Sequence, residues 1–457
     1  MVEPASFPHA ARIDWDAAAA EGALHLKQLL RIDTTNPPGN ERAAADYIAR
    51  VLGGAGIPFR VVEAAPTRAS LVARLPGSGK GAPLLLSGHL DVVPAEPERW
   101  RHDPFGGEEH DGCIWGRGAI DMKNMVAMSL VTLLLLHRTG ARLDRDVVFA
   151  AVADEEAGSR MGAGFLVDRH PELVRAEYVL TEIGAYTLYF GDAVFYPIQV
   201  AEKGICWFEL TAEGTAGHGS MPRDDSAVVR IARAVEALGT VRLPLHKTPV
   251  VEAFLRRLAQ GAPFPQNAAL PLLLNPRLAG ALLELVRRQD PEQAVGLNAL
   301  LRNTASPTVL KGGTKVNVIP STASVIVDGR ILPGETVGDF LREIENVVGP
   351  DLKVTVHEQR EGTVFDPKTP LFDAIRRTIE AHHPGAVTVP FMIPGFTDAH
   401  AYAQLGATCY GFTPVRMPRG MSYTSLYHGH DERIPVDGFA WGLRVLYDLV
   451  SSFCGGG

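Results

Sequence analysis

A histidine and several carboxylates stand where apolar runs of the chain end or begin. The positions that share this placement are His89 and Asp91, Asp121, the run from Asp154 to Glu156, and Glu182. Imidazole nitrogen and carboxylate oxygen are ligands that zinc binds in proteins. A single aspartate before a helix is more often an N-cap, and an isolated Glu-Glu pair is ordinarily solvated surface. Several such positions in one chain indicate a metal site.

The elements around these residues are expected to bring them together. Short, continuously apolar stretches predict buried strands, and longer ones between them predict helices. The predicted strands are 83–91, 146–154 and 178–182; the predicted helices are 17–31, 41–56 with Asn40 as N-cap, and 122–137. Alternation of this kind predicts an α/β domain with a mostly parallel central sheet. Ligands of such sheets bind beyond the carboxyl ends of the strands, where the polar residues stand.

The pattern changes near residue 203. A strand with alternating faces, helices, and two further strands predict a small α+β domain inserted into the first, over 203–362. Its predicted elements are strands at 206–211, 315–319 and 324–330 and helices at 224–239 and 276–288, with an enlargement at 243–303. The α/β domain then consists of 1–202 and 363–457 and ends in a helix from 437.

Composition excludes some classes of partner. The chain has 457 residues and a formal net charge of −8, and phosphate binding needs a basic surface, so no nucleic-acid partner is expected. The longest central apolar stretch, 125–136, is too short to span a membrane. The N-terminus lacks the pattern of a signal peptide, and the four cysteines are widely spaced. A cytoplasmic location is therefore expected.

Five strings together resemble peptidase family M20, which includes aminoacylase, carboxypeptidase G, acetylornithine deacetylase and succinyl-diaminopimelate desuccinylase. They occur in order along the chain: SGHLDVVP at 87–94, GRGAIDMK at 116–123, ADEEAG at 153–158, GHGSMP at 217–222 and HGHDE at 428–432. The resemblance implies a zinc-peptidase-like catalytic domain. It also implies that the insert is a lid or dimerisation domain.

The resemblance further implies two zinc ions, with cobalt or manganese as alternatives. Asp121 would bridge the two ions; His89 and Glu182 would complete one site, and Glu156 and His428 the other. Two ions sharing a carboxylate can hold a water between them and lower its pKa. Glu155 would be the general base that takes the proton of this water.

Asp91 has a supporting role in this hypothesis. On an extended segment, residues i and i+2 share a face, so the Asp91 carboxylate is predicted to accept a hydrogen bond from the ring of His89. The alternative is a plain turn residue. The resemblance also implies a cis peptide bond at Asp121–Met122.

His218 lies in the predicted insert. A histidine between glycines is ordinarily a surface turn, but the resemblance implies that it donates a hydrogen bond to the oxyanion of the reaction. It could act in its own chain or in the partner subunit of a homodimer; the sequence leaves both open.

Four further residues match substrate-contacting positions of the family: Asn317, Arg330, Gly395 and Thr397. The alternative for Arg330 is a surface salt bridge. The loop 394–400 resembles the family's Gly-Gly-Thr-Asp-Ala-Arg loop near the substrate carboxylate. It departs from that pattern at Phe396 and His400, so the identity of the substrate stays open.

These residues predict hydrolysis of an amide bond next to a free carboxylate, in an N-acyl-amino acid or a short peptide. Glu182 favours deacylases and carboxypeptidases over aminopeptidases and dipeptidases, which remain the alternative. The reverse reaction, N-acyl-amino-acid synthesis, also stays open because the same site catalyses both directions. A non-enzymatic binding protein is disfavoured, since all five ligands and Glu155 are present.

Overall fold

The computed structural model describes residues 13–456, which fall into two compact units. Unit 1 contains the described residues up to Val200, together with Phe365–Pro390 and the described residues from Thr397. Unit 2 contains Ala201–Val364 and Phe391–Phe396. The predicted insert, 203–362, falls inside unit 2, and the segment 391–396 joins it from a part of the chain that we assigned to the catalytic domain.

A mixed sheet forms the centre of unit 1, as predicted. Its strand order is β1-β2-β6-β3-β7-β18-β9-β16, of which β16 belongs to unit 2, and β8 and β17 also pair with β9. The strands are β1 Phe59–Ala65, β2 Arg68–Leu75, β3 Gly81–His89, β6 Arg145–Val152, β7 Tyr178–Thr181, β8 Leu188–Phe190, β9 Ala193–Glu202, β16 Thr363–Val364, β17 Val387–Ile393 and β18 Thr408–Gly411. The central strands β6, β3, β7 and β18 run parallel. Their residues are almost all buried, as expected of strands covered on both faces.

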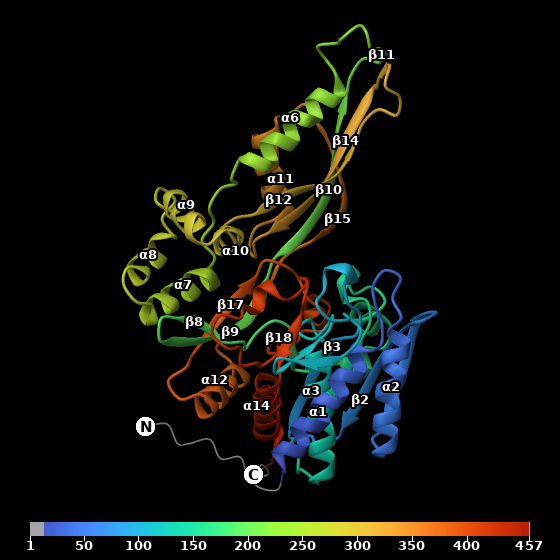
Figure 1. Ribbon diagram of the computed structural model, residues 1–457, viewed down its shortest axis with the longest axis vertical. Helices are drawn as coiled ribbons and strands as arrows, with labels where there is room; N and C mark the ends of the chain where they lie inside the picture. The colour runs from blue at the N-terminus through green and yellow to red at the C-terminus, as the bar shows by residue number, and fades with distance from the viewer. Residues whose placement is uncertain (1–12, 457) are drawn as a thin grey trace. The chain divides into compact units, whose positions relative to one another are not determined.

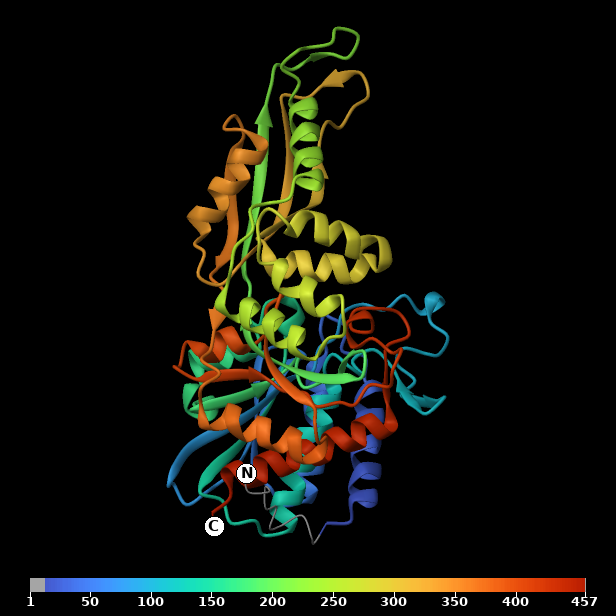
Figure 2. The same ribbon diagram turned by 90° about the vertical axis from the view of Figure 1, so that its left-hand side faces the viewer.

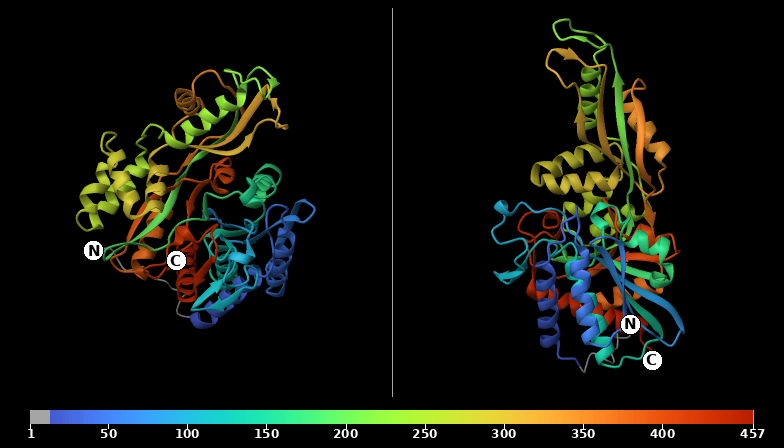
Figure 3. Two further views of the ribbon diagram at one scale, coloured as in Figure 1. Left: turned by 45° about the horizontal axis from the view of Figure 1, so that its top comes forward. Right: turned by 90° about the vertical axis from the view of Figure 1, so that its right-hand side faces the viewer.

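Helices α1 Trp15–Leu30, α3 Lys123–Arg138 and α14 Val436–Cys454 pack together as one layer of unit 1 (Figure 3). Every residue of α3 from Lys123 to Leu136 is buried, and α3 lies against β3 and β6. The remaining helices of the unit are α2 Glu41–Gly54, α4 Ala163–Arg169, α5 Pro171–Val174, α12 Pro370–His382 and α13 Ala399–Ala403. Helix α2 begins after Asn40 as predicted. The Asn40 side chain accepts no capping hydrogen bond from the helix, and its amide nitrogen donates to the carbonyl of Asp33.

A four-stranded antiparallel sheet organises unit 2, in the order β12-β14-β10-β15 (Figure 1). These strands are β10 Gly204–Glu213, β12 Thr304–Lys311, β14 Thr322–Ile331 and β15 Lys353–Arg360. Burial alternates along β10 and β14, and the buried face packs on helices α6 Ala227–Thr240 and α11 Val337–Val348. The strand predicted at 315–319 is shorter, since only β13 Val318–Ile319 pairs, with β11 Gly217–His218.

The predicted enlargement consists of four helices that pack in sequence order within unit 2 (Figure 2). They are α7 Pro249–Gly261, α8 Gln266–Leu272, α9 Ala279–Gln289 and α10 Pro291–Leu301. All four cysteines of the chain are buried, and none of them forms a disulfide. No helix within residues 13–456 is long and apolar enough to cross a membrane.

Candidate metal centre

Three neighbouring strands of unit 1 deliver most of the predicted ligands to one edge of the sheet. His89 is the last residue of β3, and the turn that holds Glu155 and Glu156 follows β6. Glu182 directly follows β7. Because β6, β3 and β7 are adjacent and parallel, their carboxyl ends meet, and the side chains that follow them lie close together.

The other two predicted ligands, Asp121 and His428, come on loops framed by a small sheet. This sheet consists of β4 Glu108–His110, β5 Cys113–Trp115 and β19 Arg433–Pro435. The loop that carries Asp121 leaves β5, and the loop that carries His428 enters β19, which pairs with β5. Pairing of the two strands therefore brings together loops more than three hundred positions apart in sequence.

Five residues form two groups that share Asp121. His89 Nε2 lies 3.0 Å from Asp121 Oδ1 and 3.5 Å from Glu182 Oε2. His428 Nε2 lies 3.2 Å from both Asp121 Oδ2 and Glu156 Oε2. In each group one ligand atom per residue lies within 4.8 Å of the others. The two oxygens of Asp121 thus face different groups, which is the arrangement a bridging carboxylate requires.

Unpaired oxygens in both groups fit divalent cations. Glu156 Oε1 and Glu182 Oε1 are buried and accept no hydrogen bond from any residue in the described part of the chain. A buried carboxylate oxygen without a partner is costly unless a cation coordinates it. Each group offers one imidazole and two carboxylates, a donor set that suits zinc and related ions. The residues present therefore fit a two-cation centre.

The electrostatics of these residues favour positive charge. Burial raises the pKa of Glu182 to about 8. Burial alone would lower the pKa of His428, but its contacts with Asp121 and Glu156 raise this pKa to about 10. Protons and metal ions compete for the same imidazole nitrogens, so cation binding is expected to release protons.

Glu155 is buried beside the centre and belongs to neither ligand group. Desolvation and then the negative charge of Glu182 raise its pKa well above the ordinary value for glutamate. Asp154, the residue before it, has a left-handed backbone with φ of 68°, which forms the turn between β6 and the glutamates. A carboxyl group with a raised pKa next to a metal centre is suited to accept and return a proton.

The predicted hydrogen bond between the Asp91 carboxylate and the His89 ring is wrong in detail. His89 Nδ1 donates to the backbone carbonyl of Asp91 at 2.9 Å, while the nearest carboxylate oxygen lies at 3.6 Å. The carboxylate instead accepts hydrogen bonds from the backbone N–H groups of Glu155 and Glu156, both at 3.1 Å, and from Asn36 at 2.8 Å. It is drawn away from the imidazole by these three donors. Asp91 therefore positions the backbone of the two glutamates and fixes His89 through its main chain.

A buried ion-pair network that the sequence does not signal supports the same turn. Arg68 donates to both oxygens of Glu41, at 2.7 and 2.8 Å, and to Asp154 Oδ1 at 2.7 Å. All three side chains are almost fully buried. Because Asp154 lies directly before Glu155, this network holds the turn that carries Glu155. Arg68 stands in no motif, so no local pattern could have identified it.

Glu432 organises the loop of the bridging aspartate. Its carboxylate accepts hydrogen bonds from the backbone N–H groups of Gly118, Ile120 and Asp121 and from Arg117, at 2.7–3.1 Å. Glu432 is completely buried. The bond Asp121–Met122 in this loop is cis, as the family resemblance implied.

In unit 2, His218 and Asn317 lie side by side near the tip of the β10–β14 ribbon. His218 pairs with Val318, and the N–H of Gly219 donates to the carbonyl of Asn317 at 2.9 Å. The backbone N–H of Ser220 donates to His218 Nδ1 at 3.3 Å. With Nδ1 as an acceptor, the proton of a neutral ring resides on Nε2, which can then donate to a ligand.

Arg330 lies at the opposite end of unit 2. It donates from Nε and Nη2 to the two oxygens of Asp328, at 2.8 and 3.0 Å, so one edge of the guanidinium is occupied. Arg330 and Arg360 both lie over the ring of Phe396, at 5.4 and 4.6 Å from its centre. Gly395 therefore belongs to a basic and aromatic cluster. Thr397 is a buried residue of unit 1.

The distance between Arg330 and His218 follows from strand register. Arg330 pairs with Ile205 near the start of β10, and Glu213 pairs with Thr322 at its end. Eight residue steps at roughly 3.3 Å give about 26 Å along the strand. The ribbon then continues outward through β11, which Figure 1 places at the far end of the sheet. Within one copy of unit 2, Arg330 and His218 are therefore too far apart to contact the same small molecule.

Comparisons with known proteins agree with the motifs. The profile of peptidase family M20/M25/M40 matches residues 85–452. The human N-fatty-acyl-amino acid synthase/hydrolase PM20D1 is 31% identical over 388 residues, covering 81% of this chain and 74% of the relative. Pig aminoacylase-1 is 28% identical over 441 residues, covering 93% and 94%. The crystal structure of an M20 metallo-carboxypeptidase from Sulfolobus solfataricus has the same fold, with a TM-score of 0.71, 16% identity and coverage of 95% and 99%.

Proposed function

The chain belongs to peptidase family M20/M25/M40 and is a metal-dependent hydrolase, and from that premise we propose that it deacylates N-acyl-amino acids with two zinc ions. The observation that carries the proposal is the shared Asp121, whose two oxygens face separate histidine-carboxylate groups. His89 and Glu182 would hold one ion, and Glu156 and His428 the other. Such a pair of cations, when bound, lowers the pKa of water and polarises a carbonyl.

Glu155 is proposed to carry the proton through the reaction. It would accept a proton from the attacking water and return it to the nitrogen of the leaving amino acid, so that the amine departs neutral. Its burial and its position outside both ligand groups support this role. Asp91 would keep Glu155 in place by accepting a hydrogen bond from its backbone N–H group.

The substrate class is proposed from the basic cluster and from the relatives. Arg330 keeps one guanidinium edge unused by Asp328, and this edge matches the geometry of a carboxylate. Two relatives are named aminoacylase-1 and N-fatty-acyl-amino acid synthase/hydrolase, and these names support an N-acyl-amino acid as the substrate. A dipeptidase or carboxypeptidase remains the second candidate, since the likeness to a carboxypeptidase concerns the fold.

We further propose a homodimer in which His218 serves the metal centre of the other copy. The separation of about 26 Å or more between His218 and Arg330 in one unit supports this arrangement. An exposed apolar surface on α6 and the edge strand β12, consisting of Val228, Val229, Val309 and Leu310, supports a contact between copies. A histidine donor to the oxyanion is worth roughly 3 kcal/mol in the transition state.

Paired substrates test the reaction. The purified protein, loaded with zinc, is given an N-acyl-amino acid and the dipeptide that carries the same C-terminal residue but a free amine. We expect kcat/KM to be higher for the acylated compound, with products identified by mass spectrometry. Higher kcat/KM for the dipeptide would favour the second candidate, and no turnover of either class would contradict the proposed function.

Mixing two inactive variants tests the dimer. Glu155→Ala removes the base, and His218→Ala is expected to lower kcat more than it raises KM. In a mixed dimer, one centre receives an intact Glu155 from one copy and an intact His218 from the other. Activity of the mixture above the sum of its parts supports action between copies. No gain, with mixed dimers verified by mass, would mean that His218 acts in its own chain.

The identity of the metal and the location of the protein belong to the same proposal. Zinc is proposed over cobalt and manganese because the donor set contains imidazole as well as carboxylate. Elemental measurement of the purified protein checks this, with two equivalents of zinc as the expected result. A cytoplasmic location is proposed because none of the four cysteines forms a disulfide, which fits a reducing compartment.

A further inference from the structure

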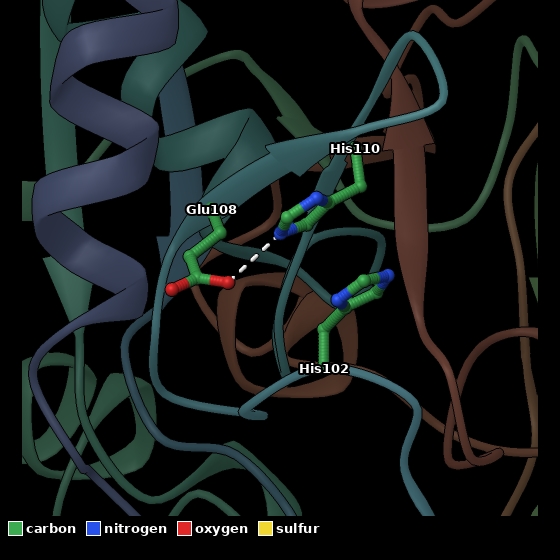
Figure 4. Close-up of side chains that lie close together, drawn as sticks. All are labelled: His102, Glu108 and His110. Atoms are coloured by element: carbon green, nitrogen blue, oxygen red, sulfur yellow. Dashed lines mark hydrogen bonds and ion pairs between the residues drawn. The ribbon is translucent and has the colours of Figure 1, made fainter.

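A second group of possible ligands lies in unit 1, outside the five residues of the metal centre. It consists of His102, Glu108 and His110 (Figure 4). Glu108 and His110 are the ends of strand β4, so they are two residues apart and project from the same face. The turn after β4, at Asp111 and Gly112, has positive φ at both residues and folds β5 back onto it. His102 reaches the same face from the preceding loop.

The three side chains converge closely. One ligand atom of each lies within 4.8 Å of the others, and His110 Nε2 is 2.8 Å from Glu108 Oε2. The two imidazoles stack at 3.8 Å, and the ring of Trp115 packs edge-on against His102 at 4.6 Å. His102 makes no hydrogen bond or ion pair with any residue of 13–456. All three side chains are partly exposed, so a cation has a route of entry.

We propose that this group, the hairpin site, binds a third divalent cation of the copper, nickel and zinc class. Two imidazole nitrogens and one carboxylate oxygen form the His₂Glu donor set of this class, whereas magnesium and calcium prefer oxygen ligands alone. Three protein ligands leave the remaining positions to water. A cation bound by both His102 and His110 must lie in the plane of each ring. Because the two rings are stacked and nearly parallel, one of them must turn when the cation binds. His102, which has no hydrogen bond to break, is the ring that turns.

The hairpin site is connected to the loop of a catalytic ligand. Arg101, next to His102, donates from its backbone N–H and from Nε to Asp431, at 2.8 and 2.7 Å. Asp431 stands three positions after His428. Strand β5 of the hairpin pairs with β19, which follows that loop. A cation at the hairpin site therefore fixes the segment that holds Arg101, and it stabilises the folded protein by mass action.

Copper as a probe distinguishes this site from the metal centre. The full chain is first loaded with zinc, which gives no paramagnetic signal, and then receives one further equivalent of Cu²⁺. We expect an electron paramagnetic resonance spectrum with hyperfine coupling to two imidazole nitrogens, together with a rise in Tm. His102→Ala should reduce the coupling to one nitrogen, and Glu108→Gln should weaken binding while it preserves the shape of the side chain.

A matched control comes from unit 2. His357 lies 3.5 Å from Glu209, so His357→Ala removes another exposed histidine that faces a carboxylate but has no second imidazole beside it. We expect its copper spectrum to equal that of the unaltered protein. An unchanged spectrum in both His102→Ala and His110→Ala would overturn the proposal. So would a copper signal that disappears in His428→Ala and persists in His110→Ala, because copper would then occupy the metal centre.

Discussion

The metal centre and the hairpin site have similar donor atoms, but they differ in how far apart their residues lie in the sequence and in how deeply they are buried. The five proposed ligands of the metal centre come from positions 89 to 428, on three strand ends and two loops, and four of them are buried or nearly so. The three residues of the hairpin site lie within 102–110 and are partly exposed. Around the centre, Asp91 and Glu432 accept buried hydrogen bonds from the backbone and Arg68 donates one to Asp154. The hairpin histidines instead pack mainly on each other and on Trp115.

This difference separates a preorganised site from a site that forms on binding. At the metal centre, other residues already hold each ligand, so little order is lost when a cation binds. At the hairpin site a ring must turn, and the cost of that motion reduces affinity. We therefore expect tight, slowly exchanging cations at the centre and a weaker, rapidly exchanging cation at the hairpin.

The largest expected effect separates chemistry from cation binding at the centre. Glu155→Ala should reduce turnover by about 10³-fold while zinc content stays at two equivalents, because the side chain takes protons and holds no ion. Steady-state kinetics and elemental measurement on the same sample check this. Glu155→Asp, which retains a carboxylate of shorter reach, should recover part of the rate. Turnover close to that of the unaltered protein in Glu155→Ala would mean that another group is the base.

The next effect concerns stability around the centre. Glu432→Ala removes the acceptor of three backbone N–H groups and leaves Arg117 as an unpaired buried charge, which costs about 3–5 kcal/mol of unfolding free energy. Asp431→Ala is the matched control, since its partner Arg101 is exposed and such pairs contribute about 1 kcal/mol or less. Denaturant unfolding of the zinc-free proteins measures both. Equal losses of unfolding free energy in the two variants would mean that the buried contacts of Glu432 stabilise the protein no more than the exposed ion pair of Asp431.

A smaller effect tests the corrected role of Asp91. Asp91→Ala removes the carboxylate that accepts hydrogen bonds from the backbone N–H groups of Glu155 and Glu156. We expect cation affinity and kcat each to fall by about 10- to 100-fold. Asp91→Asn retains one acceptor oxygen and should lose less. Competition with a zinc chelator gives the affinities. If Asp91→Ala retained full affinity, the turn would be held by Arg68 and Glu41 without Asp91.

The smallest effect is expected at the hairpin. His110→Ala should change kcat/KM of the zinc-loaded protein by no more than about twofold, as is usual for exposed residues away from the chemistry. A brief treatment with chelator should remove a cation from the hairpin site before activity declines. Parallel loss of activity and of the hairpin cation would show that the two sites are not independent.

The sequence predicted the parts of the centre that local patterns determine. Apolar runs identified β3, β6 and β7, and their parallel alignment was enough to bring His89, Glu155 and Glu182 to one edge. Asp121 was noticed from its place before an apolar helix, but its bridging role and the identity of His428 came from the motifs. Their meeting depends on the pairing of β5 with β19, which no local pattern indicates.

The predictions that failed concern contacts that depend on the folded arrangement, which sequence spacing does not show. Because residues i and i+2 share a face, the sequence placed the Asp91 carboxylate near His89. In the structure this carboxylate accepts hydrogen bonds from three N–H donors, and the His89 ring donates to the backbone carbonyl of Asp91 instead. Motif matching assigned His218 as a donor to the oxyanion and Arg330 as a substrate contact, without any information on the distance between them. Strand register places them at opposite ends of unit 2, and spacing along a sequence does not reveal this.

The pairing of β5 with β19 also sets the order of events during synthesis. When the ribosome has made residues 89 to 182, four ligands exist, but the strand that guides His428 into place has not been translated. Such a nascent chain also lacks Glu432, which holds the backbone N–H groups of the Asp121 loop, so neither ligand group has all of its structural support at that stage. The complete set of five side chains exists only once the polypeptide has been extended past His428 and its neighbour strand β19.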